Sequence, residues 1–164
     1  RLAKTGMLRS AHMLGNEEEI IFAATDLLAD TKLAPELSNE AHYYRAKAYL
    51  DAGKTDGAME DLKVLAKDTR NVYGAEAKYK VAQIYFDGGQ TDKAEQEVLN
   101  YIEVSTPHTY WLARSLVLLA DVYMKSGRNL DAKQYLLSLK QNYQADDDIA
   151  GMIESRLEKL KTEN

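Results

Sequence analysis

The feature that most constrains the fold of this chain is an internal repeat, marked by four glycines separated by 38, 36 and 38 residues. Each glycine ends a predicted helical run, because glycine adopts the left-handed backbone conformation that closes a helix at little cost. A polar segment and a second helical run follow each time. Units of this length predict stacked helix pairs that bury their apolar faces against their neighbours. The glycines are Gly15, Gly53, Gly89 and Gly127.

A second element of the repeat lies upstream of the glycine, where a small residue is followed three positions later by a tyrosine. The two residues share one helical face and form a hole and a knob for a neighbouring helix. An alanine five positions after the glycine lets two helices cross closely. The pattern occurs three times, as Ala46-Tyr49-Gly53-Ala58, Ala82-Tyr85-Gly89-Ala94 and Ala120-Tyr123-Gly127-Ala132.

These residues resemble the signature of the tetratricopeptide repeat family, over about residues 3 to 143. The resemblance implies an all-α fold, a right-handed superhelix of stacked antiparallel helix pairs with four repeats. A last amphipathic segment, 147–161, is expected to cap the fourth repeat. We expect a single domain over 1–164, with repeats near 3–37, 38–72, 73–106 and 107–144. The expected repeat helices are 3–14, 17–30, 38–52, 55–67, 73–88, 91–104, 108–126 and 129–142; Ser105 or Thr106 with Pro107 forms the entry to the seventh.

The sequence departs from the family pattern at several positions. His42, Lys78 and Leu116 stand where the family has an early tryptophan, and Arg45 stands where a leucine is usual. Such lengthened, degenerate repeats are similar to those of bacterial cell-envelope proteins, including outer-membrane assembly lipoproteins and Tol-Pal accessory proteins. We therefore favour the periplasm or cell envelope over the cytoplasm.

Composition limits the classes of partner. The chain has 164 residues and a net charge of −5, and its charges are mixed along the sequence, so a nucleic-acid partner is not expected. The longest apolar stretch, Trp111 to Ala120, carries Arg114 and is too short to insert into a membrane. The chain opens on Arg1 rather than methionine, which suggests a fragment of a larger protein.

No arrangement of catalytic or metal-binding residues is found in the sequence. Cysteine is absent, which excludes disulfides, zinc-thiolate sites and cysteine nucleophiles. His12, His42 and His108 lack the spacing of metal ligands on one helix. The acidic runs 17–19 and 146–148 stand at helix starts, where acidic residues are expected in any case. We therefore expect no enzyme, no metal and no cofactor.

The resemblance implies that the first helix of each pair lines a concave groove. The predicted function is a scaffold that binds a peptide or protein segment there. The alternatives left open are a structural spacer or a self-association module, and groove residues that merely pack against an adjacent repeat or domain. A clamp for a C-terminal carboxylate, known from some family members, is not expected, because few of the corresponding positions are basic. The predicted groove residues are Tyr43, Lys47, Leu50, Tyr79, Gln83, Phe86, Val117, Asp121 and Met124.

Overall fold

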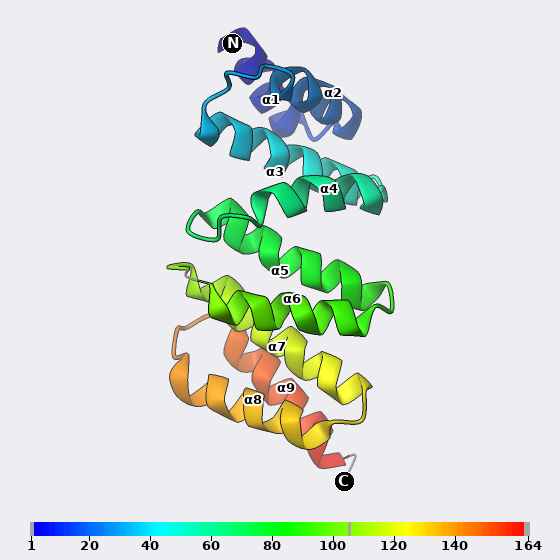
Figure 1. Cartoon of the computed structure of the whole chain (residues 1–164), viewed down its shortest axis with the longest axis vertical. Coiled ribbons are helices and arrows are strands. Elements are labelled where there is room, and N and C mark those ends of the chain that lie inside the picture. Colours follow the sequence, from blue (N-terminus) through cyan, green and yellow to red (C-terminus); the bar gives the residue numbers. More distant parts are fainter. Residues whose placement is uncertain (1, 105, 163–164) are drawn as a thin grey trace. The chain divides into compact units, whose positions relative to one another are not determined.

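The structure, a computed structural model, describes residues 2–104 and 106–162. These residues form nine α-helices and no strand (Figure 1), which confirms the predicted all-α class. The chain divides into two compact units, residues 1–68 (unit 1) and 69–164 (unit 2). The prediction of a single domain over 1–164, with its repeat boundaries, stays a prediction.

Unit 1 contains two antiparallel helix pairs. The first pair is α1 (Leu2–Leu14) and α2 (Glu17–Leu28), and the second is α3 (Pro35–Asp51) and α4 (Thr55–Leu65). α3 packs on both α2 and α4 and also touches α1. The buried cluster that joins α1, α2 and α3 is built largely from alanine and leucine, so the helices approach closely. It consists of Leu8, Ala11, Ile20, Ala23, Ala24, Leu27, Ala41 and Ala48.

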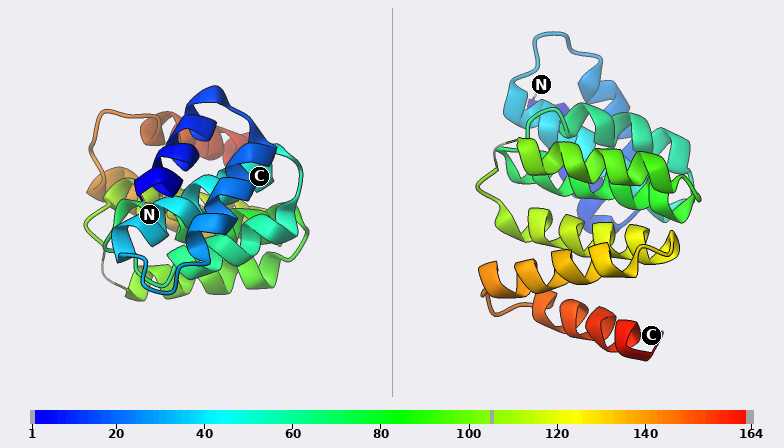
Figure 2. Two further views of the ribbon diagram at one scale, coloured as in Figure 1. Left: turned by 90° about the horizontal axis from the view of Figure 1, so that it is seen from above. Right: turned by 60° about the horizontal axis from the view of Figure 1, so that its bottom comes forward.

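Unit 2 contains two further pairs and a single last helix. The helices are α5 (Val72–Asp87), α6 (Thr91–Glu103), α7 (Thr109–Lys125), α8 (Asn129–Asn142) and α9 (Ile149–Thr162). α7 packs on both α5 and α6, and α9 packs in the same way on both α7 and α8 (Figure 2). α9 buries its apolar face, with Ile149, Ile153 and Leu160 in the core, as the predicted cap requires.

The glycines and alanines of the repeat signature lie as predicted, at helix ends and in buried helix contacts. All four repeat glycines have positive φ, between 70° and 79°, and each ends a helix. After Gly53, for example, the amide of Lys54 donates to the carbonyl oxygen of Tyr49 at 2.7 Å, which closes the helix end. The alanines on either side of the glycines are buried, at 2% exposure or less: Ala46, Ala58, Ala82, Ala94, Ala120 and Ala132.

Five helix starts differ from the predicted positions, those of α1, α5 and α7 by one residue, that of α9 by two and that of α3 by three. α3 begins at Pro35 rather than 38, because proline fits the first turn of a helix, where its missing amide is not needed. α7 begins at Thr109, two residues after Pro107. Instead of opening the helix, Thr106 donates its hydroxyl to the carbonyl oxygen of Thr69 at 2.7 Å and accepts from the amide of His108. Ser105 lies outside the described residues.

Candidate functional site

The helices α5, α7 and α9 form the inner row of unit 2, because each packs on the one before it. Positions 38 residues apart on α5 and α7, and 35 apart on α7 and α9, are equivalent in this stack. Three lines of side chains therefore run across the row. They are Tyr79, Val117 and Met152, then Gln83, Asp121 and Arg156, then Phe86, Met124 and Lys159.

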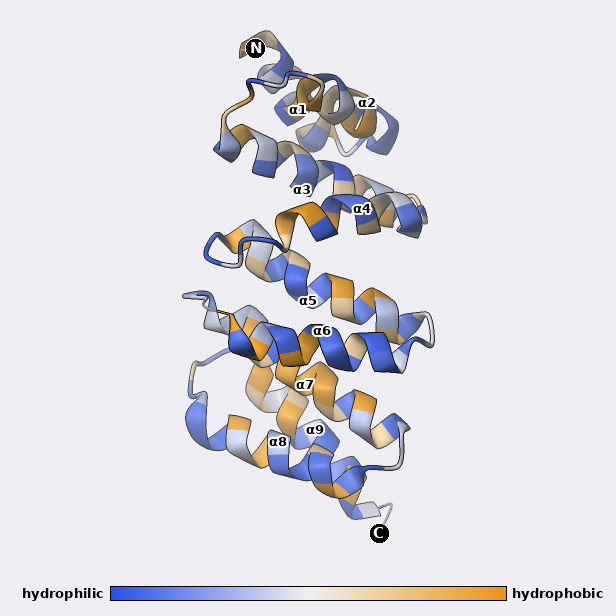
Figure 3. Ribbon diagram, in the orientation of Figure 1, coloured by the Kyte–Doolittle hydropathy of each residue, from blue (hydrophilic) through white to orange (hydrophobic). Residues whose placement is uncertain are grey.

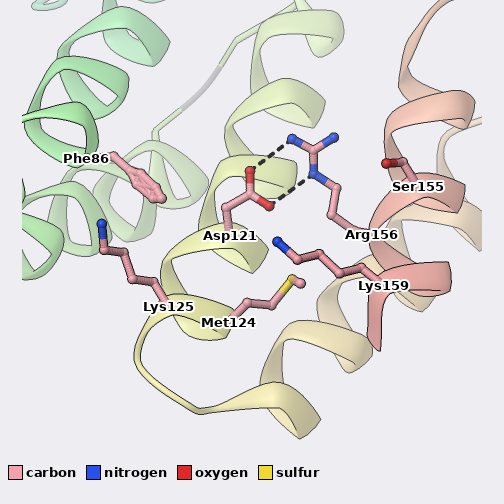
Figure 4. A pocket seen from close by; sticks show the side chains of 7 residues that line it. All are labelled: Phe86, Asp121, Met124, Lys125, Ser155, Arg156 and Lys159. Atoms are coloured by element: carbon pink, nitrogen blue, oxygen red, sulfur yellow. Dashed lines mark hydrogen bonds and ion pairs between the residues drawn. The ribbon is translucent and has the colours of Figure 1, made fainter. Parts of the chain in front are cut away.

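A hollow on this row has a volume of about 530 Å³ (Figure 4). That volume lies within the range of about 300–1,000 Å³ usual for ligand sites. In Figure 4 the ring of Phe86 and the side chain of Met124 border the hollow, and the amino groups of two lysines extend beside them. The lining residues are Phe86, Asp121, Met124, Lys125, Ser155, Arg156 and Lys159.

An ion pair links α7 to α9 at the side of this hollow. Nε and Nη2 of Arg156 donate to the two carboxylate oxygens of Asp121, each at 3.0 Å. Such two-point pairing fixes both side chains in one geometry. The hydrogen bonds to Asp121 raise the pKa of Arg156 above its usual value and outweigh the lowering by burial. Asp121 and Arg156 therefore line the hollow as an ion pair with no net charge.

A smaller hollow of about 140 Å³ adjoins the first and shares Asp121 and Arg156 with it. Tyr79 lies at its side and donates its hydroxyl to Oε1 of Gln83 at 2.8 Å. The guanidinium of Arg114 lies 5.1 Å from the centre of the Tyr79 ring. Burial raises the pKa of the Tyr79 hydroxyl, although the positive charge of Arg114 opposes the shift. Tyr79 is thus a neutral hydrogen-bonding group at ordinary pH.

The structure brings all six predicted groove residues of unit 2 to these two hollows. Two of them are largely buried, since Tyr79 is 8% exposed and Val117 is 2% exposed. Their side chains therefore lie mostly beneath the surface of the site rather than on it. Arg156 and Lys159 were missed by the sequence analysis, which treated α9 only as a cap. The 35-residue spacing that continues the lines from Asp121 and Met124 could have identified them.

The three predicted groove residues of unit 1, Tyr43, Lys47 and Leu50, lie half-buried on α3. The amino group of Lys47 lies 5.3 Å from the centre of the Tyr43 ring, within reach of a cation–π interaction. The ring of Tyr43 also lies 6.0 Å from that of Tyr44, on the same helix. That these residues share a groove with those of unit 2 stays a prediction.

Unit 1 also holds a buried polar cluster that the sequence analysis did not find. Asp61 on α4 is 1% exposed, and both of its carboxylate oxygens accept hydrogen bonds from Arg45, at 2.6 and 2.8 Å. Nδ1 of His42 lies 2.8 Å from the same carboxylate. Burial raises the pKa of Asp61, but the hydrogen bonds from His42 and Arg45 outweigh it and hold that pKa below its usual value.

This cluster contains a histidine beside a carboxylate, and Arg45 extends its hydrogen-bond network to a hydroxyl. The hydroxyl of Thr25 accepts from Nη1 of Arg45 at 3.0 Å. An equivalent pair occurs 36 residues later, where Nζ of Lys78 contacts Glu97 at 2.7 Å. Both pairs join positions 19 residues apart, which is the sequence signal that could have revealed them. The cluster therefore holds α3 and α4 together.

The other histidines and the acidic run 146–148 also have structural partners. His12 stacks on the ring of Tyr44, with the ring centres 4.1 Å apart. Nε2 of His108 lies 3.1 Å from the carbonyl oxygen of Arg70. Asp148 accepts from the hydroxyl of Tyr110 at 2.9 Å. Within residues 2–104 and 106–162, no group of three or more histidine and carboxylate side chains is placed to hold a metal ion.

The outer face of α1 and α2 exposes large apolar side chains. Leu14 is 78% exposed and Phe22 is 68% exposed, and Leu2, Met7 and Met13 are exposed beside them. Met7, Leu14 and Phe22 line a hollow of about 740 Å³, with Glu18 and Glu19 among its lining residues. Separately, none of the described helices is long and apolar enough to span a membrane.

Comparison with known proteins identifies the fold. Residues 40–68, which cover most of α3 and all of α4, match the family model described as the tetratricopeptide repeat. The chain is similar to the solved structure of MamA, with 21% sequence identity, a TM-score of 0.62 and coverage of 96% of each chain. The fold is that of a tetratricopeptide-like helical repeat. The predicted resemblance is thus confirmed for the fold.

A second solved structure has the same tetratricopeptide-like architecture. It is a Podosopora anserina protein described as a kinesin light chain with nearly identical TPR-like repeats. It is 15% identical to this chain, with a TM-score of 0.58, and the match covers 98% of this chain and 92% of that one. At these identities the likeness shows the fold alone. No curated protein matches the chain in sequence.

Proposed function

We propose that this tetratricopeptide-like chain is a non-enzymatic scaffold that binds a protein or peptide segment along the inner row of its first helices. Proteins with tetratricopeptide-like repeats are commonly protein-binding scaffolds, which supports the general class. The observation that carries the proposal is the convergence of six predicted residues, from α5 and α7, on two adjoining hollows of unit 2. A rigid helical row with apolar side chains and polar neighbours suits an extended or helical segment.

Site-specific photo-crosslinking tests this proposal. A benzoylphenylalanine in place of Phe86 puts a reactive group at the larger hollow, and one in place of Leu130 puts it on the exposed face of α8. In extract of the source cells, we expect protein adducts from position 86 that position 130 does not give. Equal adducts from both positions, or none from position 86, would remove the hollow as the binding site.

Self-association is the second candidate function, and the exposed apolar face of α1 and α2 favours it. Such a contiguous patch marks an interaction surface more often than ordinary solvent-exposed surface. If a second copy covers it, sedimentation should show a mass that rises with concentration in the wild type. Phe22→Ser should lower that association, whereas Leu130→Ser should leave it unchanged. A monomer at every concentration would exclude self-association and leave the scaffold and the structural spacer as candidate functions.

The place of the chain in the cell also remains a proposal. The similarity of its degenerate repeats to bacterial cell-envelope proteins is the sole reason for proposing the periplasm or cell envelope. Fractionation of the source cells, with the protein followed by antibody, tests it directly. Recovery with cytoplasmic markers would contradict it.

A further inference from the structure

We infer that the inner row of unit 2 takes an acidic peptide segment that carries an apolar side chain beside its carboxylates. This inference rests on the proposed function and names the chemistry of the partner. It is drawn from the balance of charge around the two hollows and from the apolar surface between them.

The hollows carry an excess of positive charge. Four cations line them, Arg114, Lys125, Arg156 and Lys159, against the single carboxylate of Asp121. Because Arg156 is paired with Asp121, the other three cations have no carboxylate within ion-pair distance among residues 2–104 and 106–162. The chain as a whole has a net charge of −5, so this positive site is a local departure. An anionic segment is the partner that this charge attracts.

The three remaining cations are held in different ways. The guanidinium of Arg114 is kept over the Tyr79 ring and donates to the hydroxyl of Tyr110 at 3.2 Å. The amino group of Lys125 lies 5.4 Å from the centre of the Phe86 ring. Lys159 has no carboxylate within ion-pair distance among the described residues, and Figure 4 shows its amino group directed toward the hollow. Both lysines are thus available to a carboxylate.

Apolar surface lies between the two lysines. Phe86 and Met124 are half-buried, so each keeps part of its side chain open to the hollow. A carboxylate held by Lys125 or Lys159 would leave a neighbouring side chain of the partner within reach of Phe86 and Met124. An apolar side chain would gain from that contact, whereas a polar one would lose its water. A free inorganic anion would leave this apolar surface unused.

Selection from a random 12-residue peptide library tests the inference. The library is panned on the full chain, on Lys125→Gln/Lys159→Gln and on the matched control Lys133→Gln/Lys140→Gln, which removes two charges from α8. Enriched peptides are then synthesised and titrated by fluorescence anisotropy. We expect peptides with Asp or Glu next to Leu, Ile or Phe, bound about ten-fold more weakly by the hollow variant and unchanged by the control, a loss of the size reported for charged interface pairs.

Salt and sequence changes separate the charge from the apolar contact. Affinity should fall as sodium chloride rises, because exposed charges are screened at a Debye length of about 8 Å near physiological ionic strength. Replacing Glu by Gln in the peptide should weaken binding as much as removing the two lysines does. Phe86→Ala should weaken binding without changing its salt dependence.

The outcomes distinguish this inference from the proposed function. Enriched peptides that are neutral or basic, and that Phe86→Ala still weakens, would overturn the acidic partner and leave the scaffold. Acidic peptides bound equally by the hollow variant and the control would overturn the site. A library with no peptide enriched on the wild-type chain over the Phe86→Ala chain would overturn both.

Discussion

The helix pairs α3–α4 and α7–α8 share one repeat signature, yet they fill the same three positions with opposite chemistry. In α3–α4 these positions hold His42, Arg45 and Asp61, which form the buried polar cluster. In α7–α8 the equivalent positions hold Leu116, Leu119 and Tyr135, all part of the apolar core of unit 2 or packed against it. Figure 3 shows the result, with α3 mostly hydrophilic and α7 mostly hydrophobic along their lengths.

The pair between them combines the two. In α5–α6 the three positions hold Lys78, Val81 and Glu97, so one charged pair remains and the arginine is replaced by an apolar residue. The shared glycines and alanines set the helix pair, while these three positions can be held by ion pairs or by apolar contact. Substituting a residue of an ion pair and a residue of an apolar contact should therefore affect stability in different ways.

The largest effect is expected from Asp61→Ala. The change leaves the guanidinium of Arg45 and the ring of His42 without their buried acceptor, and removing one partner of a buried ion pair costs about 3–5 kcal/mol. Hydrogen exchange measured by mass spectrometry should show lost protection in α3 and α4. Asp131→Ala removes an exposed carboxylate, paired with Arg128, and should cost at most about 1 kcal/mol. Equal losses from the two variants would contradict the buried cluster.

Leu119→Ala removes an apolar side chain at the position in α7 that corresponds to Arg45 in α3. Leu119 is completely buried in unit 2, so the change leaves a cavity and should cost about 2–5 kcal/mol. Trp111, the single tryptophan of the chain, lies on α7 and reports the unfolding of unit 2 by its fluorescence. The loss should be the same at pH 4 and pH 7, because no charge is removed. A loss that depends strongly on pH would show that the core there is not purely apolar.

Acid should separate the two regions further. Since the pKa of Asp61 is lower in the folded chain than its ordinary value of 3.8, its stabilising effect is complete above that value and is lost as pH falls through the folded pKa. Glu40 shifts in the same direction from 4.5, mainly because Arg9 donates hydrogen bonds to it. Exchange protection in α3 should therefore fall below about pH 4. Unchanged protection in α3 down to pH 2 would contradict this.

The smallest change at neutral pH is expected when the polar cluster is replaced by the residues of the fourth repeat. The variant His42→Leu/Arg45→Leu/Asp61→Tyr exchanges three charged or polar groups for apolar ones. Such replacements are often neutral or stabilising, by about 1–4 kcal/mol. The contribution of Asp61 to acid sensitivity should disappear with it. A strong loss of stability at pH 7 would show that the cluster is needed for the geometry of α3 and α4.

Much of the fold could be predicted from the sequence, because the backbone demands of the repeat are local. A glycine such as Gly89 is required wherever the chain turns left-handed, and Ala94 wherever two helices cross, so both mark the elements directly. Helix ends were less certain. Thr106, predicted as part of the entry to α7, bonds instead to Thr69, 37 residues away, and α7 begins at Thr109.

The site was only partly predictable. Gln83, Phe86 and Met124 keep the spacing of their repeats, so their common location could be derived. Arg156 and Lys159 lie beyond the last repeat signature, and their place depends on α9 packing as a further first helix. The polar cluster was missed because His42 and Asp61 lie on different helices and neither carries a signal alone.

The binding site in unit 2 is the central claim, and mapping a bound peptide by NMR tests it most directly. The chain is labelled with ¹⁵N and titrated with a peptide from the library, and the amide shifts are followed along the sequence. The account predicts that the shifted amides lie on the facing sides of α5, α7 and α9, around Phe86, Asp121 and Lys159. Shifts confined to α1 and α2, around Leu14 and Phe22, would contradict it and place binding on the exposed apolar face instead.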